Sequence, residues 1–312
     1  MILVIKMGGR EMKFATISLE EKILVGIVDE NGIVPLNDAE EKRTGRRPYA
    51  EDLVTCMEQE DFLNNVRSLI HWIEEQNDQA NFYIPMEKVK FLAPIPRPRK
   101  NIFCVGKNYV EHAIEMGSKE DIPKHVMVFT KAPTTVIGHL NDVLEHKEVT
   151  EQLDYEGELA VVIGKRGKGI EKEKALDYIF GYTILNDITA RDLQKKHKQF
   201  FIGKSLDTSA PMGPWIVTSD SITDPNSLNI TTTVNGEVRQ QSNTTHFIFP
   251  IEEVISVLSK GMTLEPGDII ATGTPAGVGK GFNPPRFLKA GDIIEISVEG
   301  IGTLINKVAR DK

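Results

Sequence analysis

The stretch LDYEGELAVVIGK, residues 153–165, combines two features that decide how this chain folds. Every residue from Leu159 to Ile163 is apolar, so a strand here would bury both of its faces. The stretch begins, however, with the carboxylates of Glu156 and Glu158. Side chains at positions i and i+2 of a strand share one face, so these two would repel each other unless a positive group lies near them. Water, a lysine and a metal ion are the candidates for what separates them.

The bulk composition limits the class of protein. At 312 residues the chain has the length of about two domains, and its 40% hydrophobic and 26% charged residues are ordinary for a soluble globular protein. A net charge of −8 argues against nonspecific nucleic-acid binding, which needs a basic surface. The two cysteines, Cys56 and Cys104, have no paired spacing, so neither a disulfide framework nor a zinc–thiolate site is indicated. No apolar run approaches the roughly 20 residues that span a membrane, and we expect a cytoplasmic protein.

The N-terminal part changes from a strand pattern to a helix pattern. Residues 12–36 read as two or three short strands, with DENG at 29–32 as a hairpin turn. Residues 49–78 place apolar side chains at helical spacing: Phe62, Val66, Leu69, Ile70 and Ile73. We therefore expect a small α+β domain over residues 1–94, in which residues 1–11 are an extra strand or a disordered start.

A proline-rich connector, APIPRPRKN at residues 93–101, separates this part from the rest of the chain. Such a run cannot form a helix interior and behaves as a stiff extended segment. Residues 95–312 are rich in short apolar runs between Gly, Pro and Asn-Gly turns, of which VNGEV at 234–238 is a strong hairpin signal. We expect these residues to form the second, catalytic domain.

Helical signals are few in this second domain. The clearest are EKEKALDYIF at 171–180 and PIEEVISVLSKG at 250–261, the latter with Gly261 as its C-cap. These helices are too few for alternating βαβ units. The sequence therefore predicts a strand-dominated α+β fold, built as a mixed and largely antiparallel β-sandwich or roll.

A third acid follows another apolar run, because YTILND ends at Asp187. Three carboxylates at strand ends, with no cysteine or paired histidine nearby, suit a hard divalent cation such as Mg²⁺ or Mn²⁺. Taken alone, Glu156 and Glu158 would more often mark a solvated strand face. A structural salt-bridge cluster with Arg191 is also consistent with the spacing.

Three other segments supply groups that could act on a substrate. Lys204, between two apolar segments, is either a counter-ion of the acids or a group that stabilises a developing enolate. Thr274 lies in a Gly-rich turn that could bind an anion, although the turn is not a phosphate loop. His112 and Glu115 are three residues apart, so on a short helix they share a face, either as a catalytic dyad or as a surface pair.

Taken together, five ordered segments resemble the fumarylacetoacetate hydrolase family. The resemblance covers roughly residues 95–305, and it is carried by FCVGKNYVEHAIEMG, DYEGELAVVIGK, GYTILNDITARDLQ, GKSLDTSAPMGPW and ATGTPAGVGKG. It implies a mixed β-sheet roll and a homodimer or larger assembly. The small N-terminal domain resembles that of the bacterial two-part members of the family.

The resemblance also implies roles for individual residues. The three acids correspond to the family's ligands for Mg²⁺ or Mn²⁺, and Lys204 corresponds to its active-site lysine. His112 and Glu115 correspond to a dyad, carried on a lid over residues 110–125, that some members use to activate water. The remaining correspondences are positions that bind the substrate or line its pocket: Gly106, Asn108, Arg191, Gln194 and Thr274.

The implied reaction is metal-dependent cleavage of a carbon–carbon bond in a short 2-oxo carboxylate through an enolate. We expect an oxaloacetate decarboxylase or an acylpyruvate hydrolase, because these substrates are short. A dienedioate isomerase or decarboxylase of aromatic catabolism is the alternative enzyme. A metabolite-binding or interaction protein without turnover is the alternative of another class. No nucleic-acid or membrane partner is expected.

Overall fold

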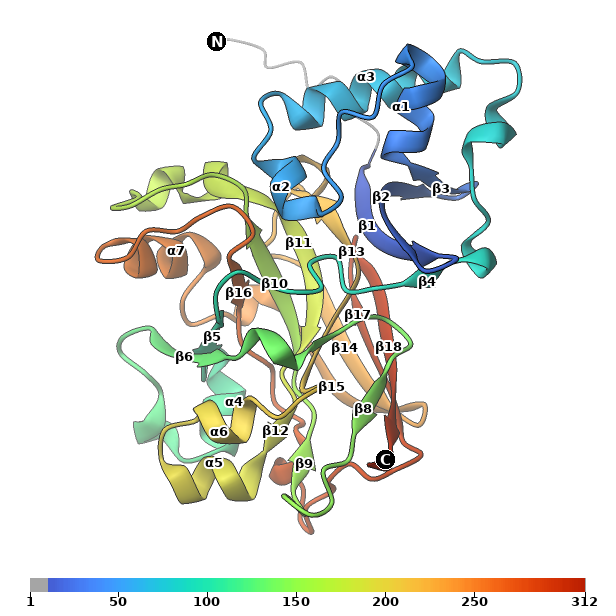
Figure 1. Cartoon of the computed structure of the whole chain (residues 1–312). Coiled ribbons are helices and arrows are strands. Elements are labelled where there is room, and N and C mark those ends of the chain that lie inside the picture. The colour runs from blue at the N-terminus through green and yellow to red at the C-terminus, as the bar shows by residue number, and fades with distance from the viewer. Residues whose placement is uncertain (1–10, 312) are drawn as a thin grey trace.

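The computed structural model describes residues 11–311, and two β-sheets dominate its backbone (Figure 1). The larger is an 11-stranded mixed sheet. Its main path runs, in spatial order, through β3 (Gly32–Pro35), β2 (Lys22–Asp29), β1 (Lys13–Leu19), β13 (Ala210–Thr218), β11 (Ile179–Asn186), β10 (Gly157–Ile163), β16 (Ile269–Ala271), β5 (Ile102–Gly106) and β6 (Met127–Lys131). Two short strands lie beside this path, one on β1 and one on β13: β4 (Lys90–Phe91) and β7 (Val136–Ile137).

A second sheet of five strands packs against the first. Its spatial order is β15 (Glu237–Asn243), β14 (Asn229–Val234), β17 (Ile293–Val298), β18 (Gly302–Ala309) and β8 (Asp142–Leu144). A two-stranded ladder completes the strands: β9 (Leu153–Asp154) and β12 (Thr189–Ala190). Most pairs are antiparallel, and the parallel ones are β13 with β7, β16 with β5 and β18 with β8. The predicted mixed and largely antiparallel roll is confirmed.

Strand β10 shows why the sequence at 157–163 is apolar throughout. Leu159, Val161 and Ile163 face the core between the two sheets. Ala160 and Val162 face the other way, into a second core that includes side chains of the N-terminal helices. Because β10 is central and covered on both faces, alternation of apolar and polar residues would leave polar groups buried without partners.

Helices cover the ends and edges of the sheets. The α-helices are α1 (Leu36–Thr44), α2 (Leu53–Met57), α3 (Phe62–Glu74), α4 (Val110–Glu115), α5 (Arg191–His197), α6 (Phe201–Lys204) and α7 (Ile251–Ser259). Short 3₁₀ helices are η1 (Gln79–Phe82), η2 (Met86–Lys88), η3 (Lys119–Asp121), η4 (Pro133–Thr135), η5 (Lys172–Tyr178), η6 (Ser219–Ser221), η7 (Thr244–His246) and η8 (Gly279–Gly281). In Figure 1, α1 to α3 gather at one end of the molecule and α4 to α6 at the other.

The local predictions succeed where turns and spacing are strong. The DENG turn joins β2 to β3, and the five apolar residues spaced as a helix are all buried in α3. Asn235 and Gly236 have φ of 53° and 77°, which is the left-handed geometry that a two-residue hairpin between β14 and β15 requires. The connector at 93–101 is neither helix nor strand.

Two local predictions are wrong. Most of the helix expected over 171–180 is the 3₁₀ helix η5. The last two residues of the expected helix, Ile179 and Phe180, belong to β11, where they are buried in the sheet. The C-cap of α7 is Lys260 in right-handed helical geometry, not Gly261. Gly261 therefore does not supply the left-handed conformation for which a C-cap glycine is selected.

The N-terminal strands continue the main sheet, since β1 pairs with β13. The division of the chain at residues 94 and 95 stays a prediction. The structure begins at Glu11, so the expected extra strand or disordered start lies almost wholly outside the described residues. Among the helices between residues 11 and 311, none is both long enough and apolar enough to cross a bilayer.

Candidate active site

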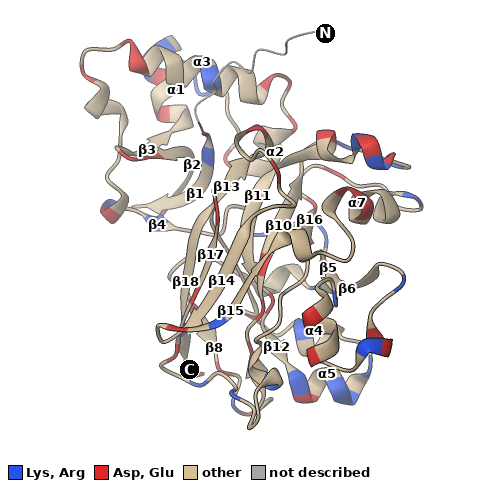
Figure 2. Ribbon diagram, turned by 180° about the vertical axis from the view of Figure 1, so that it is seen from behind, with Lys and Arg blue, Asp and Glu red and all other residues tan. Residues whose placement is uncertain are grey.

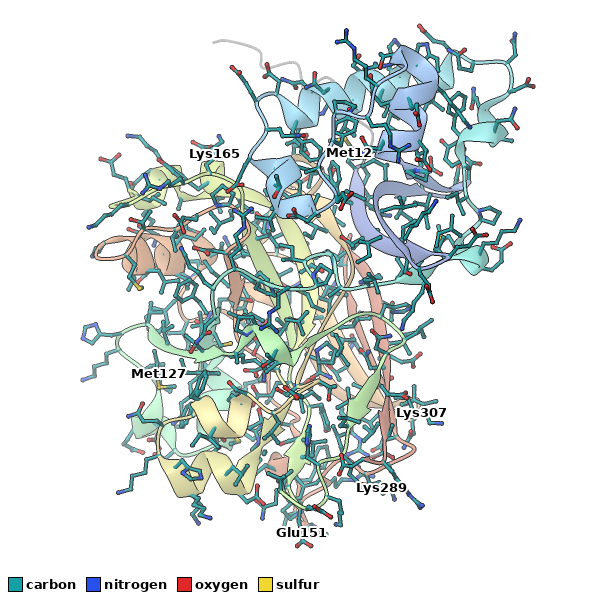
Figure 3. All side chains as sticks on the ribbon, in the orientation of Figure 1. Met12, Met127, Glu151, Lys165, Lys289 and Lys307 are labelled. Atoms are coloured by element: carbon teal, nitrogen blue, oxygen red, sulfur yellow. The ribbon has the colours of Figure 1, made fainter. Side chains whose placement is uncertain are left out.

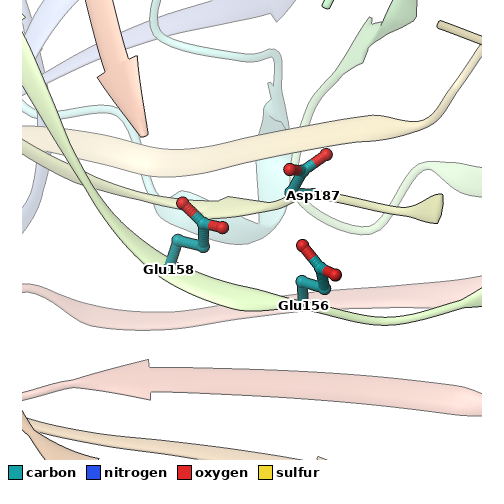
Figure 4. Close-up of side chains that lie close together, drawn as sticks. All are labelled: Glu156, Glu158 and Asp187. Carbon is teal, nitrogen blue, oxygen red and sulfur yellow. The ribbon is translucent and has the colours of Figure 1, made fainter. Parts of the chain in front are cut away.

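The three predicted acids converge at one end of β10 and β11. Glu156 directly precedes β10, Glu158 is its second residue, and Asp187 directly follows β11. The antiparallel pairing aligns Gly157 with Asn186, which brings Glu156 opposite Asp187. One oxygen from each of the three carboxylates lies within 4.8 Å of the others, and all three residues are buried (Figure 4).

Three buried cations surround this triad. Lys204 Nζ, at the end of α6, donates hydrogen bonds to Glu156 Oε2 and Asp187 Oδ2, both at 2.7 Å. Lys131 Nζ, at the end of β6, lies 2.8 Å from Asp187 Oδ1. Arg191 Nη1, at the start of α5, lies 2.7 Å from Glu156 Oε1. Pairing of this kind is what allows carboxylates to remain charged in a buried site.

Glu158 differs from the other two acids. Its Oε2 accepts a hydrogen bond from the backbone N–H of Gly273 at 2.7 Å, and within residues 11–311 no ion pair to Glu158 is present. Burial, followed by the neighbouring charges of Asp187 and Glu156, raises the pKa of Glu158 well above its usual range. Burial alone would also raise the pKa of Glu156, but Lys204 and Arg191 outweigh it and lower that pKa to about 2.

The donor set fits a hard divalent cation. It consists of carboxylate oxygens alone, the ligands that Mg²⁺ and Mn²⁺ prefer. Glu158 is held among like charges with a single backbone donor, so a cation bound beside it would relieve the repulsion that raises its pKa. These residues would hold the ion, and Lys204 shows that a positive group is accommodated between two of them.

The predicted dyad is formed on α4. His112 Nδ1 lies 3.1 Å from Glu115 Oε2, and Glu115 Oε1 accepts the backbone N–H of Gly277 at 2.8 Å. Because an ionised carboxylate only accepts, the contact places a proton on Nδ1 and leaves Nε2 for a second partner. Glu115 thus fixes both the orientation of the imidazole and its distance from the Gly-rich loop.

A cavity of about 270 Å³ joins the dyad to the acids. Its lining contains most of the residues singled out from the sequence: Gly106, His112, Glu156, Glu158, Arg191, Gln194, Lys204 and Thr274. Further basic and apolar side chains complete the wall: Val105, Lys107, Met116, Met127, Phe129, Lys195, Phe200 and Lys280. Asp187 and Glu115 lie behind this surface, in contact with lining residues.

Asn108 and Thr274, two of the expected substrate-binding residues, use their polar side-chain atoms in hydrogen bonds within the protein. Asn108 is absent from the lining, and its amide is saturated by the backbone: Nδ2 donates to the carbonyls of Phe249 and Thr272, and Oδ1 accepts from Phe249 N–H. In this structure Asn108 positions the chain after β16 and does not face a substrate. Thr274 lines the cavity, while its hydroxyl donates to Gly157 O at 2.9 Å and accepts from Gln240 at 2.7 Å.

Sequence reasoning missed two charged residues of the site. Asp154 is fully buried and accepts from Arg191 Nε at 2.8 Å, so that Arg191 joins it to Glu156. A signal was present, because Asp154 extends the alternation of Glu156 and Glu158 by one more step of two residues. Lys131 follows an apolar strand, as Asp187 does, but its place beside the acids depends on long-range pairing through β5 and β6.

A strand-rich roll with a buried carboxylate triad and a facing His–Glu pair defines a metal-dependent enzyme class. The model of the fumarylacetoacetate (FAA) hydrolase C-terminal domain matches residues 101–309, and the chain belongs to the fumarylacetoacetate hydrolase family. The resemblance seen in the sequence is confirmed.

Three individual proteins are similar to this chain over nearly its whole length. Oxaloacetate tautomerase YisK of Bacillus subtilis is 57% identical over 300 residues, which are 95% of this chain and 100% of the relative. The fumarylacetoacetate hydrolase of Exiguobacterium antarcticum superposes with a TM-score of 0.80 at 39% identity, covering 96% of this chain and 100% of that one. Maleylpyruvate hydrolase of Sphingobium sp. SYK-6, solved with manganese(II) and pyruvate, gives a TM-score of 0.74 at 27% identity over 96% and 100%.

Proposed function

We propose that this protein is a divalent-metal-dependent enzyme that interconverts the keto and enol forms of oxaloacetate. The observation that carries the proposal is the 57% identity, over the whole length of the relative, to an oxaloacetate tautomerase. The cavity supports it, because its walls bring two of the three carboxylates together with Lys204 and His112. Its basic lining also suits an anion.

The chemistry of tautomerisation is the transfer of one proton within the substrate. A divalent cation held by the three carboxylates would supply Lewis-acid character that favours enolisation of a 2-oxo acid. His112, held by Glu115, is placed to take the proton from C3 through Nε2, while the 2-oxo oxygen gains one, so no atom is lost. Lys204 and Arg191 supply positive charge beside the oxygens on which negative charge develops.

Decarboxylation of oxaloacetate, expected from the sequence, shares the proton chemistry at C3. There the C3–C4 bond breaks, CO₂ leaves, and a proton is delivered to C3. Hydrolysis of an acylpyruvate is the second candidate, and the His112–Glu115 contact is the observation that favours it, because that pair could activate water.

The test uses protein stripped with EDTA and then supplied with Mn²⁺ or Mg²⁺. Loss of the ultraviolet absorbance of enol-oxaloacetate, release of pyruvate, and cleavage of acetylpyruvate are followed in parallel. We expect metal-dependent enol loss to be the fastest of the three reactions above the metal-only rates. Faster pyruvate release or acetylpyruvate cleavage would replace the tautomerase assignment, and no turnover by metal-loaded protein would favour the non-catalytic alternative.

The same assays separate the roles of the dyad. Replacing His112 with Ala should reduce hydrolysis more than decarboxylation, since only hydrolysis requires an activated water. Equal losses would contradict this division. We further propose a homodimer located in the cytoplasm, acting on a small 2-oxo carboxylate without a nucleic-acid or membrane partner; light scattering of the purified protein tests the assembly.

A further inference from the structure

The cavity carries more positive charge than its acids balance. Five basic side chains line it: Lys107, Arg191, Lys195, Lys204 and Lys280. Arg191 and Lys204 pair with the buried acids, and Lys107 lies 3.7 Å from a carboxylate oxygen of Asp121. Lys195 and Lys280 stand at the exposed rim of the cavity and have no ion pair with any acid in the described part of the chain. These two lysines are therefore available to pair with an anionic ligand in the cavity.

Lys280 is held in place through its backbone. Its N–H donates to Asp154 Oδ2 at 3.0 Å, and the preceding N–H, of Gly279, donates to Asp154 Oδ1 at 2.7 Å. Arg191 Nε donates to the same Asp154 Oδ2 at 2.8 Å. One fully buried carboxylate therefore fixes the position of Lys280 relative to Arg191, and the Lys280 side chain is left free to reach a ligand.

The glycines on both sides of Lys280 permit this close approach. A Cβ on Gly279 would lie 2.4 Å from the carbonyl oxygen of Arg286 and 2.6 Å from Asp154 Oδ1. A Cβ on Gly281 would lie 2.1 Å from Glu115 Oε1, so the loop touches the dyad on its other side. Lys280 is thus presented between the residue that holds Arg191 and the residue that holds His112.

The local electrostatics agree with this geometry. Burial lowers the pKa of the Lys280 ammonium, and the charges of Arg191 and Lys195 lower it further, while Asp154 acts in the opposite direction. Like charges that repel one another in this way form a region of positive potential, which an anion would stabilise. Figure 2 shows the Lys and Arg residues of α5, which include Arg191 and Lys195, beside the α4 that carries the dyad.

We propose that Lys280, assisted by Lys195, binds the second carboxylate of a four-carbon 2-oxo dicarboxylate and selects it over monocarboxylates. This inference rests on the proposed function and adds the residue that recognises the far end of the substrate. The head of the substrate would occupy the end of the cavity that contains the triad, where Lys204 and Arg191 pair with Glu156 and Lys204 also pairs with Asp187. The four-carbon length follows from the substrate of the proposed function.

The experiment measures binding of unreactive ligands to the Mn²⁺-loaded protein by calorimetry. Malate carries both a 2-hydroxy acid head and a second carboxylate; 2-hydroxybutanoate has a methyl group in its place, and oxalate resembles the head alone. The variants are Lys280→Met, Lys280→Arg and the control Lys307→Met. Lys307 lies on β18, and Figure 3 shows it on the opposite side of the molecule from Met127 of the cavity wall.

The proposal predicts that Lys280→Met weakens malate binding about three- to tenfold, the size of a partly exposed ion pair with its hydrogen bond. Oxalate and 2-hydroxybutanoate should bind as before, Lys280→Arg should keep most of the malate affinity, and Lys307→Met should change nothing. Equal weakening of all three ligands would show general attraction of anions and overturn the proposal, as would unchanged malate binding.

Three further outcomes separate this proposal from the proposed function. If Lys280→Met weakens 2-hydroxyheptanedioate and leaves malate unaffected, the second carboxylate is recognised at a greater distance and the four-carbon assignment is wrong. If the wild-type protein accelerates enol loss but Lys280→Met changes the affinities for malate and 2-hydroxybutanoate by the same factor, the subsite alone fails. If wild-type protein binds none of the ligands and has no activity on oxaloacetate, the proposed function fails with it.

Discussion

The same face of β10 is apolar at one end and charged at the other. Ala160 and Val162 contact an apolar core shared with the N-terminal helices. Glu158 and Glu156, two and four residues before Ala160, instead enter a cluster of buried acids and cations. All four side chains are buried, and the period of two places them on one side of the strand. Burial alone therefore does not distinguish structural from functional residues here. The free-energy cost of burying each side chain does.

The apolar end stabilises the fold directly, because removal of apolar surface from water is favourable. The charged end loses solvation that its ion pairs only partly restore, so buried pairs of this kind are weak contributors to stability. A sequence selected for stability alone would not require three acids and three cations at this place. We infer that the charged end is retained for chemistry, and the two ends should respond differently to substitution.

The largest effect is expected from Glu158→Gln. The substitution keeps the size of the side chain and removes the charge of the acid that has no ion-pair partner. Loss of a metal ligand removes several kcal/mol of transition-state stabilisation, so metal-dependent turnover of oxaloacetate should fall more than about a hundredfold. The melting temperature should change little; full activity in this variant would contradict the metal assignment.

Lys131→Met should affect both stability and activity. Lys131 is fully buried and pairs with Asp187, and removal of one partner of a buried pair costs about 3–5 kcal/mol of unfolding free energy. Urea unfolding measures that loss, and turnover per folded molecule should also fall because Asp187 loses one of its two ammonium partners. Normal stability would show that Lys131 is not needed to keep Asp187 charged.

Phe62→Ala tests the apolar end. Phe62 packs against the rings of Phe14 and Phe180, with centroids 5.3 and 6.4 Å away, and its truncation should cost about 3–5 kcal/mol of unfolding free energy. Activity per folded molecule and Mn²⁺ affinity should remain those of the wild type. A large loss of activity at temperatures where the variant is folded would show that the two ends are coupled.

Asp154→Asn should have a smaller effect on activity, seen in binding, together with some loss of stability because Asp154 is buried and pairs with Arg191. The amide keeps one acceptor but loses the charge opposite Arg191 and one of the acceptors for the Gly279 and Lys280 N–H groups. A loss of about 1.4 kcal/mol would raise the KM for oxaloacetate about tenfold. A change in kcat with an unaltered KM would instead place Asp154 among the groups that act in the transition state.

The two cysteines should show the smallest effect. Burial raises the pKa of Cys56 to about 12, and burial with the nearby Asp187 and Glu158 charges raises that of Cys104 well above its usual value. A raised pKa keeps a thiol protonated and therefore poorly nucleophilic near pH 7. Native protein should not react with a thiol reagent, and unfolded protein should react at both positions.

The contrast also explains how far the sequence could predict the structure. The central strand, the DENG and VNGEV turns and the α3 face follow from local patterns, and the structure confirms them. The prediction of a helix over residues 171–180 is wrong. The spacing of the apolar residues suits a helix, but Ile179 and Phe180 belong to β11. The spacing of residues along the chain does not show whether a segment will instead pair with a distant strand of a sheet.

Site residues that follow a local sequence pattern could be predicted, and those placed by long-range contacts could not. The acids stand at strand ends that the apolar runs mark, so their convergence could be expected. Lys131 and Asn108 could not be judged in this way, because their partners lie 56 and more residues away along the chain and are chosen by sheet pairing. Asn108 forms a hydrogen bond with Phe249 over 141 residues, and Lys131 with Ile188 over 57.

We expect the charged end of β10 to hold a catalytic divalent cation. A Mn²⁺ titration of EDTA-stripped wild-type protein and of Glu158→Gln tests this, monitored by calorimetry together with enol-oxaloacetate turnover. Binding to the wild type should be saturable, turnover should rise in proportion to occupancy, and both should be lost in the variant. Undiminished binding to Glu158→Gln, or turnover by the stripped protein at the rate of the loaded one, would contradict this expectation.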